Sequence, residues 1–127
     1  MVLKTKSDAK VWIGRGMTVL AALPFCFSSI MKFTGGPQML EGWTHFGWPA
    51  SLLTTVGVLE LVCVMLYLIP QVAVLGAILL TGYLGGALST HLRVGESIVI
   101  HVILGILIWG GLYLRDSRLR EILPIRR

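Results

Sequence analysis

The sequence predicts an all-α integral membrane protein, folded as an antiparallel four-helix bundle in a single transmembrane domain, residues 1–127. Hydrophobic residues make up 55% of the chain and charged residues only 13%. A soluble domain of this length would leave too much apolar surface in contact with water. The apolar residues also gather into runs close to the roughly 20 residues that a helix needs to cross a bilayer.

The four runs are separated by short segments rich in glycine, proline or charge. The spans are expected at residues 11–31, 50–69, 72–92 and 98–114. Pro24 lies inside the first span and should kink its helix. Ile69-Pro70-Gln71 is a very short connection, so the second and third spans should be antiparallel neighbours.

The segment between the first two spans is amphipathic. Thr34-Gly-Gly-Pro37 should end the first helix, and the residues up to Pro49 mix apolar and polar side chains. Trp43 and Trp48 suit a short helix or loop lying at the membrane interface. We expect this segment to cover whatever the bundle binds, with Trp43 among the ligand contacts.

The basic residues indicate an orientation. All but two of the eleven Lys and Arg residues lie in the terminal segments, the exceptions being Lys32 and Arg93. Positive charge beside apolar spans is typical of cytoplasmic ends. We therefore expect both termini in the cytoplasm, a multi-pass position in the inner (plasma) membrane with the lipid bilayer as surroundings, and no nucleic-acid partner.

Glu60 is the most informative polar residue. It lies about ten residues from either end of the second span, hence near the middle of the bilayer. A charged side chain there costs at least about 2.5 kcal/mol, so Glu60 should face the interior of the bundle. It would stay protonated unless a cation or an imidazole is in reach. Glu60 is either a catalytic proton carrier or a neutral side chain that joins helices through hydrogen bonds.

Two histidines are candidate catalytic partners of Glu60. Tyr83, Ala87 and His91 recur every four residues and share one helix face, and His101 lies about one turn into the fourth span. His91 and His101 are either acid/base groups or structural histidines near the interface. Axial haem ligation by this pair is a further alternative. No other metal-binding motif is present.

Other polar residues suggest a pocket that opens toward the outer leaflet. The ionisable residues within the spans and their outer loops run from the outer surface to the middle of the membrane. Lys32 is either an interfacial anchor or a cation facing the bundle. Tyr83 either donates a hydrogen bond to a carbonyl or quinone oxygen or fills space beside Gly82 and Gly86. The candidate substrate contacts are Lys32, Trp43, Tyr83 and Arg93.

Small residues predict close helix contacts. Gly82 and Gly86 have the spacing that lets two membrane helices approach backbone to backbone. Gly105, Gly110 and Gly111 on the fourth span could mark contact with another subunit. A homo-oligomer or a membrane partner subunit is therefore possible.

Several of these positions resemble the DoxX-like family of small four-span membrane proteins. The resemblance rests on Lys32, Gly57-Val-Leu-Glu60, Gly76-Ala77, Gly86-Ala87 and His91-Leu-Arg93, and covers about residues 16–114. It implies a four-helix bundle and quinone-linked redox chemistry, with polar positions at Lys32, Glu60 and His91. Other members of the wider group are assembly helpers without catalysis.

Three functions follow as hypotheses. The first is an oxidoreductase component that binds a lipophilic small molecule such as a quinone in the outer half of the bundle. The second is a non-catalytic helper that packs against other membrane proteins. The third is a cofactor-free acid/base enzyme, such as an isomerase, that acts on a hydrophobic substrate with the same residues.

Overall fold

The computed structural model describes residues 4–123, and every regular element in that range is a helix. The elements are α1 (Lys4–Thr34), α2 (Pro37–His45), the 3-10 turn η1 (Ala50–Leu52), α3 (Leu53–Leu68), the 3-10 turn η2 (Pro70–Val72), α4 (Ala73–Arg93), α5 (Val99–Arg115) and α6 (Ser117–Ile122). The prediction of an all-α fold is therefore confirmed.

Within residues 4–123, three helical stretches are long and apolar enough to cross a membrane. They are Ala9–Thr34, Ala50–Leu68 and Pro70–Arg93. The fourth apolar helix, α5, has 17 residues and is shorter than the others. At about 1.5 Å per residue, α5 is somewhat shorter than a hydrocarbon core of about 30 Å. The number of spans stays a prediction.

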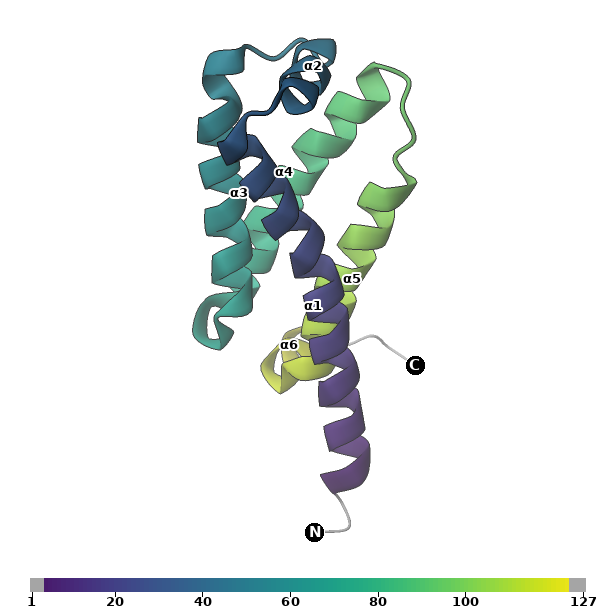
Figure 1. Cartoon of the computed structure of the whole chain (residues 1–127). Helices are drawn as coiled ribbons and strands as arrows, with labels where there is room; N and C mark the ends of the chain where they lie inside the picture. Colours follow the sequence, from purple (N-terminus) through teal and green to yellow (C-terminus); the bar gives the residue numbers. More distant parts are fainter. Residues whose placement is uncertain (1–3, 124–127) are drawn as a thin grey trace.

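The helices form a bundle in which α1 lies between α3 and α5. Helix α1 packs against both of them, and α4 packs mainly against α3. Figure 1 shows α2 and the α4–α5 turn at one end of the bundle, with α6 and the α3–α4 turn toward the other. The start of α1 and the short helix α6 therefore lie away from α2, as an even number of antiparallel passes requires.

Helix α1 is longer than the predicted span and continues through Pro24. A proline inside a helix lacks one hydrogen-bond donor and usually bends the helix. Figure 1 shows α1 leaning over toward α3 in its second half. The lean brings the C-terminal turns of α1 against α3, where the candidate site lies.

The close helix contacts are made by other glycines than the sequence suggested. A Cβ atom on Gly82 or Gly86 would meet nothing within 4 Å. The prediction that these two glycines form a close helix contact is therefore wrong for contacts within this chain. A Cβ on Gly76 would lie 2.2 Å from the backbone nitrogen of Tyr67, and one on Gly14 would lie 2.7 Å from the carbonyl oxygen of Gly111. The tight contacts are therefore α3 with α4 near their shared turn, and α1 with α5.

The glycines of α5 also have neighbours in their own chain. A Cβ on Gly111 would lie 2.9 Å from Oγ1 of Thr18, and one on Gly110 would lie 2.7 Å from the end of Met17. Gly105 faces Leu84. These residues do not need another subunit to explain their small size.

Tyr67 joins three helices at the base of the bundle. It is fully buried on α3, and its hydroxyl group donates a hydrogen bond of 2.6 Å to the carbonyl oxygen of Ile108 on α5. Oγ1 of Thr18 on α1 lies 3.3 Å from the same hydroxyl. Arg115 of α5 adds a hydrogen bond of 2.9 Å to the carbonyl oxygen of Tyr67, so this end of the bundle is joined by polar as well as apolar contacts.

Candidate functional site

A cavity of about 750 Å³ lies in the half of the bundle covered by α2. Its wall is contributed by α1, α2, α3, α4 and α5. Most of the lining is apolar or aromatic, including Pro24, Phe25, Trp48, Leu59 and Leu104. Cavities of this size with a few polar groups in an apolar wall are typical of small-molecule sites. Gly82 and Gly86 form an open part of the wall on α4, because they have no side chain to fill it.

The first polar group in the cavity is centred on Glu60 of α3. Its atom Oε2 accepts hydrogen bonds from Nζ of Lys32 at 2.7 Å and from the hydroxyl group of Tyr83 at 2.7 Å. Oγ of Ser28 is a third donor, at 3.3 Å. Three donors to one oxygen suit the carboxylate form, which only accepts hydrogen bonds. Lys32 is buried, so it faces the bundle and is not an interfacial anchor.

Helix spacing explains why these groups meet. Ser28 and Lys32 are four residues apart on α1 and therefore lie on one face, where Nζ of Lys32 also donates to Oγ of Ser28. Gly57 lies almost one turn before Glu60 on α3. A Cβ on Gly57 would be 3.1 Å from Cβ of Lys32, so the missing side chain lets α1 approach α3 at the ion pair.

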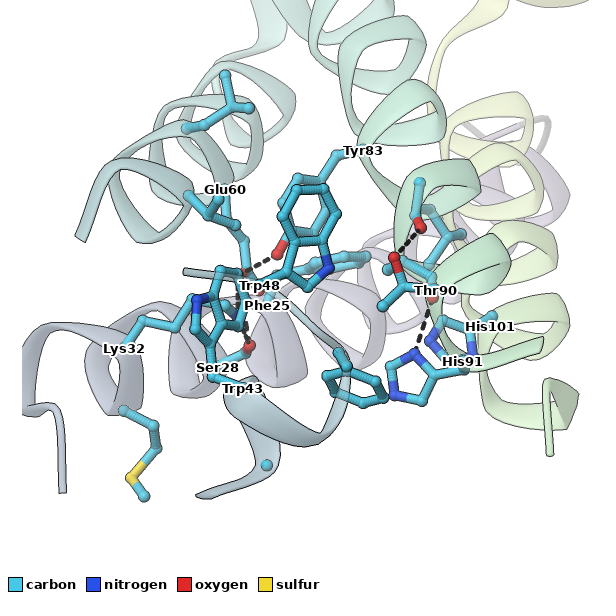
Figure 2. Close-up of a pocket in the computed structure, with 18 of the residues that line it drawn as sticks. Phe25, Ser28, Lys32, Trp43, Trp48, Glu60, Tyr83, Thr90, His91 and His101 are labelled. Carbon is cyan, nitrogen blue, oxygen red and sulfur yellow. Dashed lines mark hydrogen bonds and ion pairs between the residues drawn. The ribbon is translucent and has the colours of Figure 1, made fainter. Parts of the chain in front are cut away.

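Tyr83 brings α4 into the same group. Its ring meets Phe25 of α1 edge to face, with the ring centres 6.3 Å apart. The hydroxyl group points to Glu60 across the cavity wall, as Figure 2 shows. Tyr83 is therefore held both by aromatic packing and by a charged acceptor.

The second polar group consists of His91 and His101. Their rings are in contact, with centres 4.4 Å apart. Nδ1 of His91 lies 2.7 Å from the carbonyl oxygen of Ala87, and since a carbonyl only accepts, this nitrogen carries the proton. His101 is buried, and its Nδ1 has no hydrogen-bond partner among the described residues. A buried polar atom without a partner is uncommon and is available to a ligand.

The two polar groups lie on opposite sides of one cavity. Figure 2 shows Lys32 and Glu60 on one side, His91 and His101 on the other, with Trp48 and Phe25 between them. Within the described residues, no hydrogen bond joins Glu60 to either histidine. The sequence had suggested that they act on one another directly, whereas here they share a ligand-sized space.

The histidine pair does not suit axial ligation of a haem. Such ligation places one imidazole on each face of the porphyrin. The rings of His91 and His101 already touch, which leaves no room for a porphyrin between them. Among the residues described, no group of three or more His, Cys, Asp or Glu side chains could hold a metal ion.

The segment before α3 closes the end of the cavity. Trp43 of α2 is buried, and its Nε1 donates a hydrogen bond of 2.8 Å to the carbonyl oxygen of Pro49. Trp43 and Trp48 stack with their ring centres 6.0 Å apart. Both line the cavity. Arg93 does not line it; its guanidinium group donates instead to the carbonyl oxygen of Phe46.

The sequence did not point to three residues of this site, which are Ser28 and Phe25 of α1 and Thr90 of α4. Ser28 and Phe25 are ordinary for an apolar helix, and only their position one and two turns before Lys32 could have suggested a role. Thr90 also lines the cavity, but its hydroxyl group donates to its own helix, at Gly86. None of these residue types is unusual enough in a membrane helix to be singled out.

Comparison with known protein families gives a match over most of the chain. The model of the DoxX-like family matches residues 16–111, which cover α1 from Gly16 onward and extend into the last turns of α5. The searches of curated proteins and of solved structures gave no match.

Proposed function

The chain belongs to the DoxX-like family, and from this we propose that it is a small membrane protein whose cavity binds a quinone-type lipophilic molecule and exchanges protons with it. The observation that carries this proposal is the buried Lys32–Glu60 ion pair with the Tyr83 hydroxyl group beside it, in the wall of an otherwise apolar cavity.

The size and chemistry of the cavity suit such a ligand. A volume of about 750 Å³ lies within the usual range for small-molecule sites, roughly 300–1,000 Å³. The apolar and aromatic lining would hold the ring and the first part of a hydrocarbon tail. The polar groups on opposite sides would meet the oxygen atoms.

Each polar residue has a definite task in this proposal. Tyr83 and His101 are the hydrogen-bonding contacts to ligand oxygen. The Tyr83 hydroxyl proton, which points to Glu60 without ligand, would turn to the ligand oxygen, and His101 has a ring nitrogen without a partner among the described residues. Glu60 orients the Tyr83 hydroxyl group and can receive or return its proton. Lys32 stabilises the negative charge of Glu60. Reduction of a quinone to a quinol takes up two electrons and two protons. The electrons would come from a partner oxidoreductase, and this chain's residues would supply only the protons.

We further propose that the cavity end of the bundle faces away from the cytoplasm, in the inner (plasma) membrane. The basic residues Lys10, Arg15, Arg115, Arg118 and Arg120 lie at the other end, and this concentration of positive charge supports a cytoplasmic location for that end. Cysteines introduced singly at residue 10 and residue 97, in a chain without its two native cysteines, should react with an impermeant maleimide from opposite sides.

The central test is ligand binding by purified protein in lipid nanodiscs. Titration with decylubiquinone should quench the fluorescence of Trp43 and Trp48, which line the cavity. Tyr83→Phe removes a hydrogen bond to ligand oxygen, worth about 0.5–1.5 kcal/mol, and should weaken binding by up to about tenfold. Glu60→Gln removes the charge that orients the Tyr83 hydroxyl group and should weaken binding by a similar factor.

Two control variants distinguish an effect at the cavity from an effect of the same substitution elsewhere in the protein. Glu41→Gln removes the same charge at an exposed position outside the cavity lining, and Tyr113→Phe removes a hydroxyl group outside it. Both should bind as the unaltered protein does. Equal affinity in Glu60→Gln and the unaltered protein would contradict the proposal, as would equal losses in the controls. Mass spectrometry of lipid extracts would identify a co-purified ligand of another class.

A further inference from the structure

A line of titratable side chains leads from the outside of the protein to the cavity. Oε1 of Glu96 lies 3.7 Å from Nε2 of His45, and Oε2 of Glu96 lies 3.7 Å from Nε2 of His91. The ring of His91 then contacts that of His101. The side chains of His45, Glu96 and His91 are 59%, 43% and 29% exposed, and His101 is 7% exposed. Exposure therefore falls at every step toward the cavity.

The turn after α4 places Glu96 over His91. Gly95 has φ +79°, a left-handed conformation that residues with a side chain rarely adopt. The backbone N–H of Glu96 donates a hydrogen bond of 3.0 Å to the carbonyl oxygen of His91. The chain thus folds back on the end of α4 and brings the carboxylate beside the imidazole, an arrangement that the C-terminal end of a helix allows.

We propose that Glu96 and His91 form a proton route from the water outside the bundle to His101 in the cavity. Glu96 and the neighbouring His45 are not part of the ligand site itself, because neither side chain lines the cavity. The route explains how a site covered by α2 and two tryptophans exchanges protons with water.

Each transfer returns His91 to its starting form. With Nδ1–H held by the carbonyl oxygen of Ala87, the free Nε2 of His91 takes the proton of a protonated Glu96, which has gained it from hydronium in the water outside, and the resulting carboxylate stabilises the imidazolium. His91 then gives this Nε2 proton to Nδ1 of His101, directly or through one bridging water. His101 becomes the imidazolium and is the proton donor to the cavity.

Phe46 and Arg93 complete the surroundings of His91. Phe46 packs against the His91 ring, with ring centres 4.7 Å apart. The neighbouring cation Arg93 is directed at the carbonyl oxygen of Phe46, and it holds the segment after α2 against the end of α4. Among the residues described, two titratable groups from other elements face His91: His101 of α5 and Glu96 of the α4–α5 turn. His45 of α2 contacts Glu96 and so acts on His91 through it.

The route serves the proposed function but does not depend on the ligand's identity. It is tested without ligand, in nanodiscs with 15N-labelled histidine, from the rate at which the imidazole N–H of His101 exchanges with water. His91→Gln should slow this exchange by about a hundredfold, the lower range for loss of a positioned acid/base group. Glu96→Gln, at the exposed turn, should slow it by a smaller factor, and His45→Gln by less again.

Thr90→Val is the matched control, since Thr90 lines the cavity in the same turn as His91 and its hydroxyl group, among the residues described, bonds only to Gly86 of its own helix. It should leave the exchange rate unchanged. The route is wrong if His101 exchanges equally fast in the unaltered protein, His91→Gln and Glu96→Gln, because water then enters by another way. Equal slowing in Thr90→Val would also overturn it. Failure to bind quinone would contradict the proposed function, but it would leave the proton route intact if His91→Gln still slowed the exchange.

Discussion

Nζ of Lys32 and Oε2 of Glu60 lie 2.7 Å apart, in side chains that are only 9% and 2% exposed. The two residues come from α1 and α3, so the ion pair crosses the interface between these helices. Two charges in such a place are costly unless each satisfies the other. The pair is therefore both a structural joint and the charged centre of the cavity.

Replacing either Lys32 or Glu60 alone should destabilise the protein far more than replacing both residues together. Lys32→Met leaves the Glu60 carboxylate buried without its cation, and Glu60→Gln leaves the ammonium group without its anion. Each single change should lower the free energy of unfolding by about 3–5 kcal/mol. The double variant should lose much less than the sum. Unfolding by sodium dodecyl sulfate from mixed micelles measures this coupling, and strictly additive losses would show that the pair does not act as a unit.

Two glycines of α4 should respond in opposite ways to the same change. Gly76→Ala places a Cβ 2.2 Å from the backbone nitrogen of Tyr67, so α3 and α4 must move apart and the protein should be strongly destabilised. Gly82→Ala meets nothing within 4 Å, and should leave stability equal or raise it by up to about 1 kcal/mol through helix propensity. The same unfolding measurement compares them. Strong destabilisation by Gly82→Ala would restore the packing role that its spacing suggested.

Tyr67→Phe should loosen the base of the bundle. The change removes the hydroxyl group that donates to the carbonyl oxygen of Ile108, in a fully buried position. The expected loss of unfolding free energy is about 1–3 kcal/mol, because the carbonyl oxygen loses a buried partner. Tyr113→Phe is the control, since no hydrogen bond from its hydroxyl group is present in the described part of the chain. Equal losses of unfolding free energy in the two variants would show that the Tyr67–Ile108 hydrogen bond does not stabilise the bundle.

The short helix α6 should become less stable in acid. Asp116 precedes α6, and its Oδ1 accepts a hydrogen bond of 2.9 Å from the backbone N–H of Arg118. Burial acts to raise the pKa of Asp116, but hydrogen bonds from the side chain and backbone of Arg118 outweigh it and lower the pKa below its ordinary value of 3.8. A depressed pKa means that the carboxylate stabilises the folded form above about pH 4, and that this contribution is lost as the pH falls further.

Amide hydrogen exchange in residues 117–122, corrected for the intrinsic effect of pH, measures this loss. Protection should be constant above about pH 4 and should decrease below it, since the unfolded-state value sets the upper limit of the window. Asp116→Asn keeps an accepting side-chain oxygen but cannot titrate, so its protection should vary less with pH. A variant that follows the same pH curve as the unaltered protein would show that another group is responsible.

Part of the candidate site could be predicted from single residues. A glutamate in the middle of an apolar run has to be buried and paired, and Glu60 holds that position in the second span. The stripe that contains Tyr83 and His91 follows from the helix repeat alone. The sequence does not decide between an interfacial anchor and an inward-facing cation at Lys32, because both occur at the end of a span. Arg93 has the same charge and a similar place in its span, yet it lies outside the cavity.

The remainder depended on contacts between helices. The Gly82–Gly86 spacing is shared by packed and open helix faces, so it could not reveal that the tight contact lies at Gly76. Glu96 and His45 looked like ordinary polar residues of two loops that are far apart in sequence. Only the fold brings Glu96 to His91 and His45 to Glu96.

The sequence by itself determined that the chain is a set of apolar helices with a buried acid in the second span. The reason is that lipid offers no hydrogen bonds, so the backbone of each apolar run must satisfy itself as a helix, and a charge within it must turn inward. Only the tertiary structure decided which cation reaches that acid and which turn lies over His91. These outcomes depend on how each helix is rotated and inclined against its neighbours, and therefore on contacts such as that of Gly57 with Lys32.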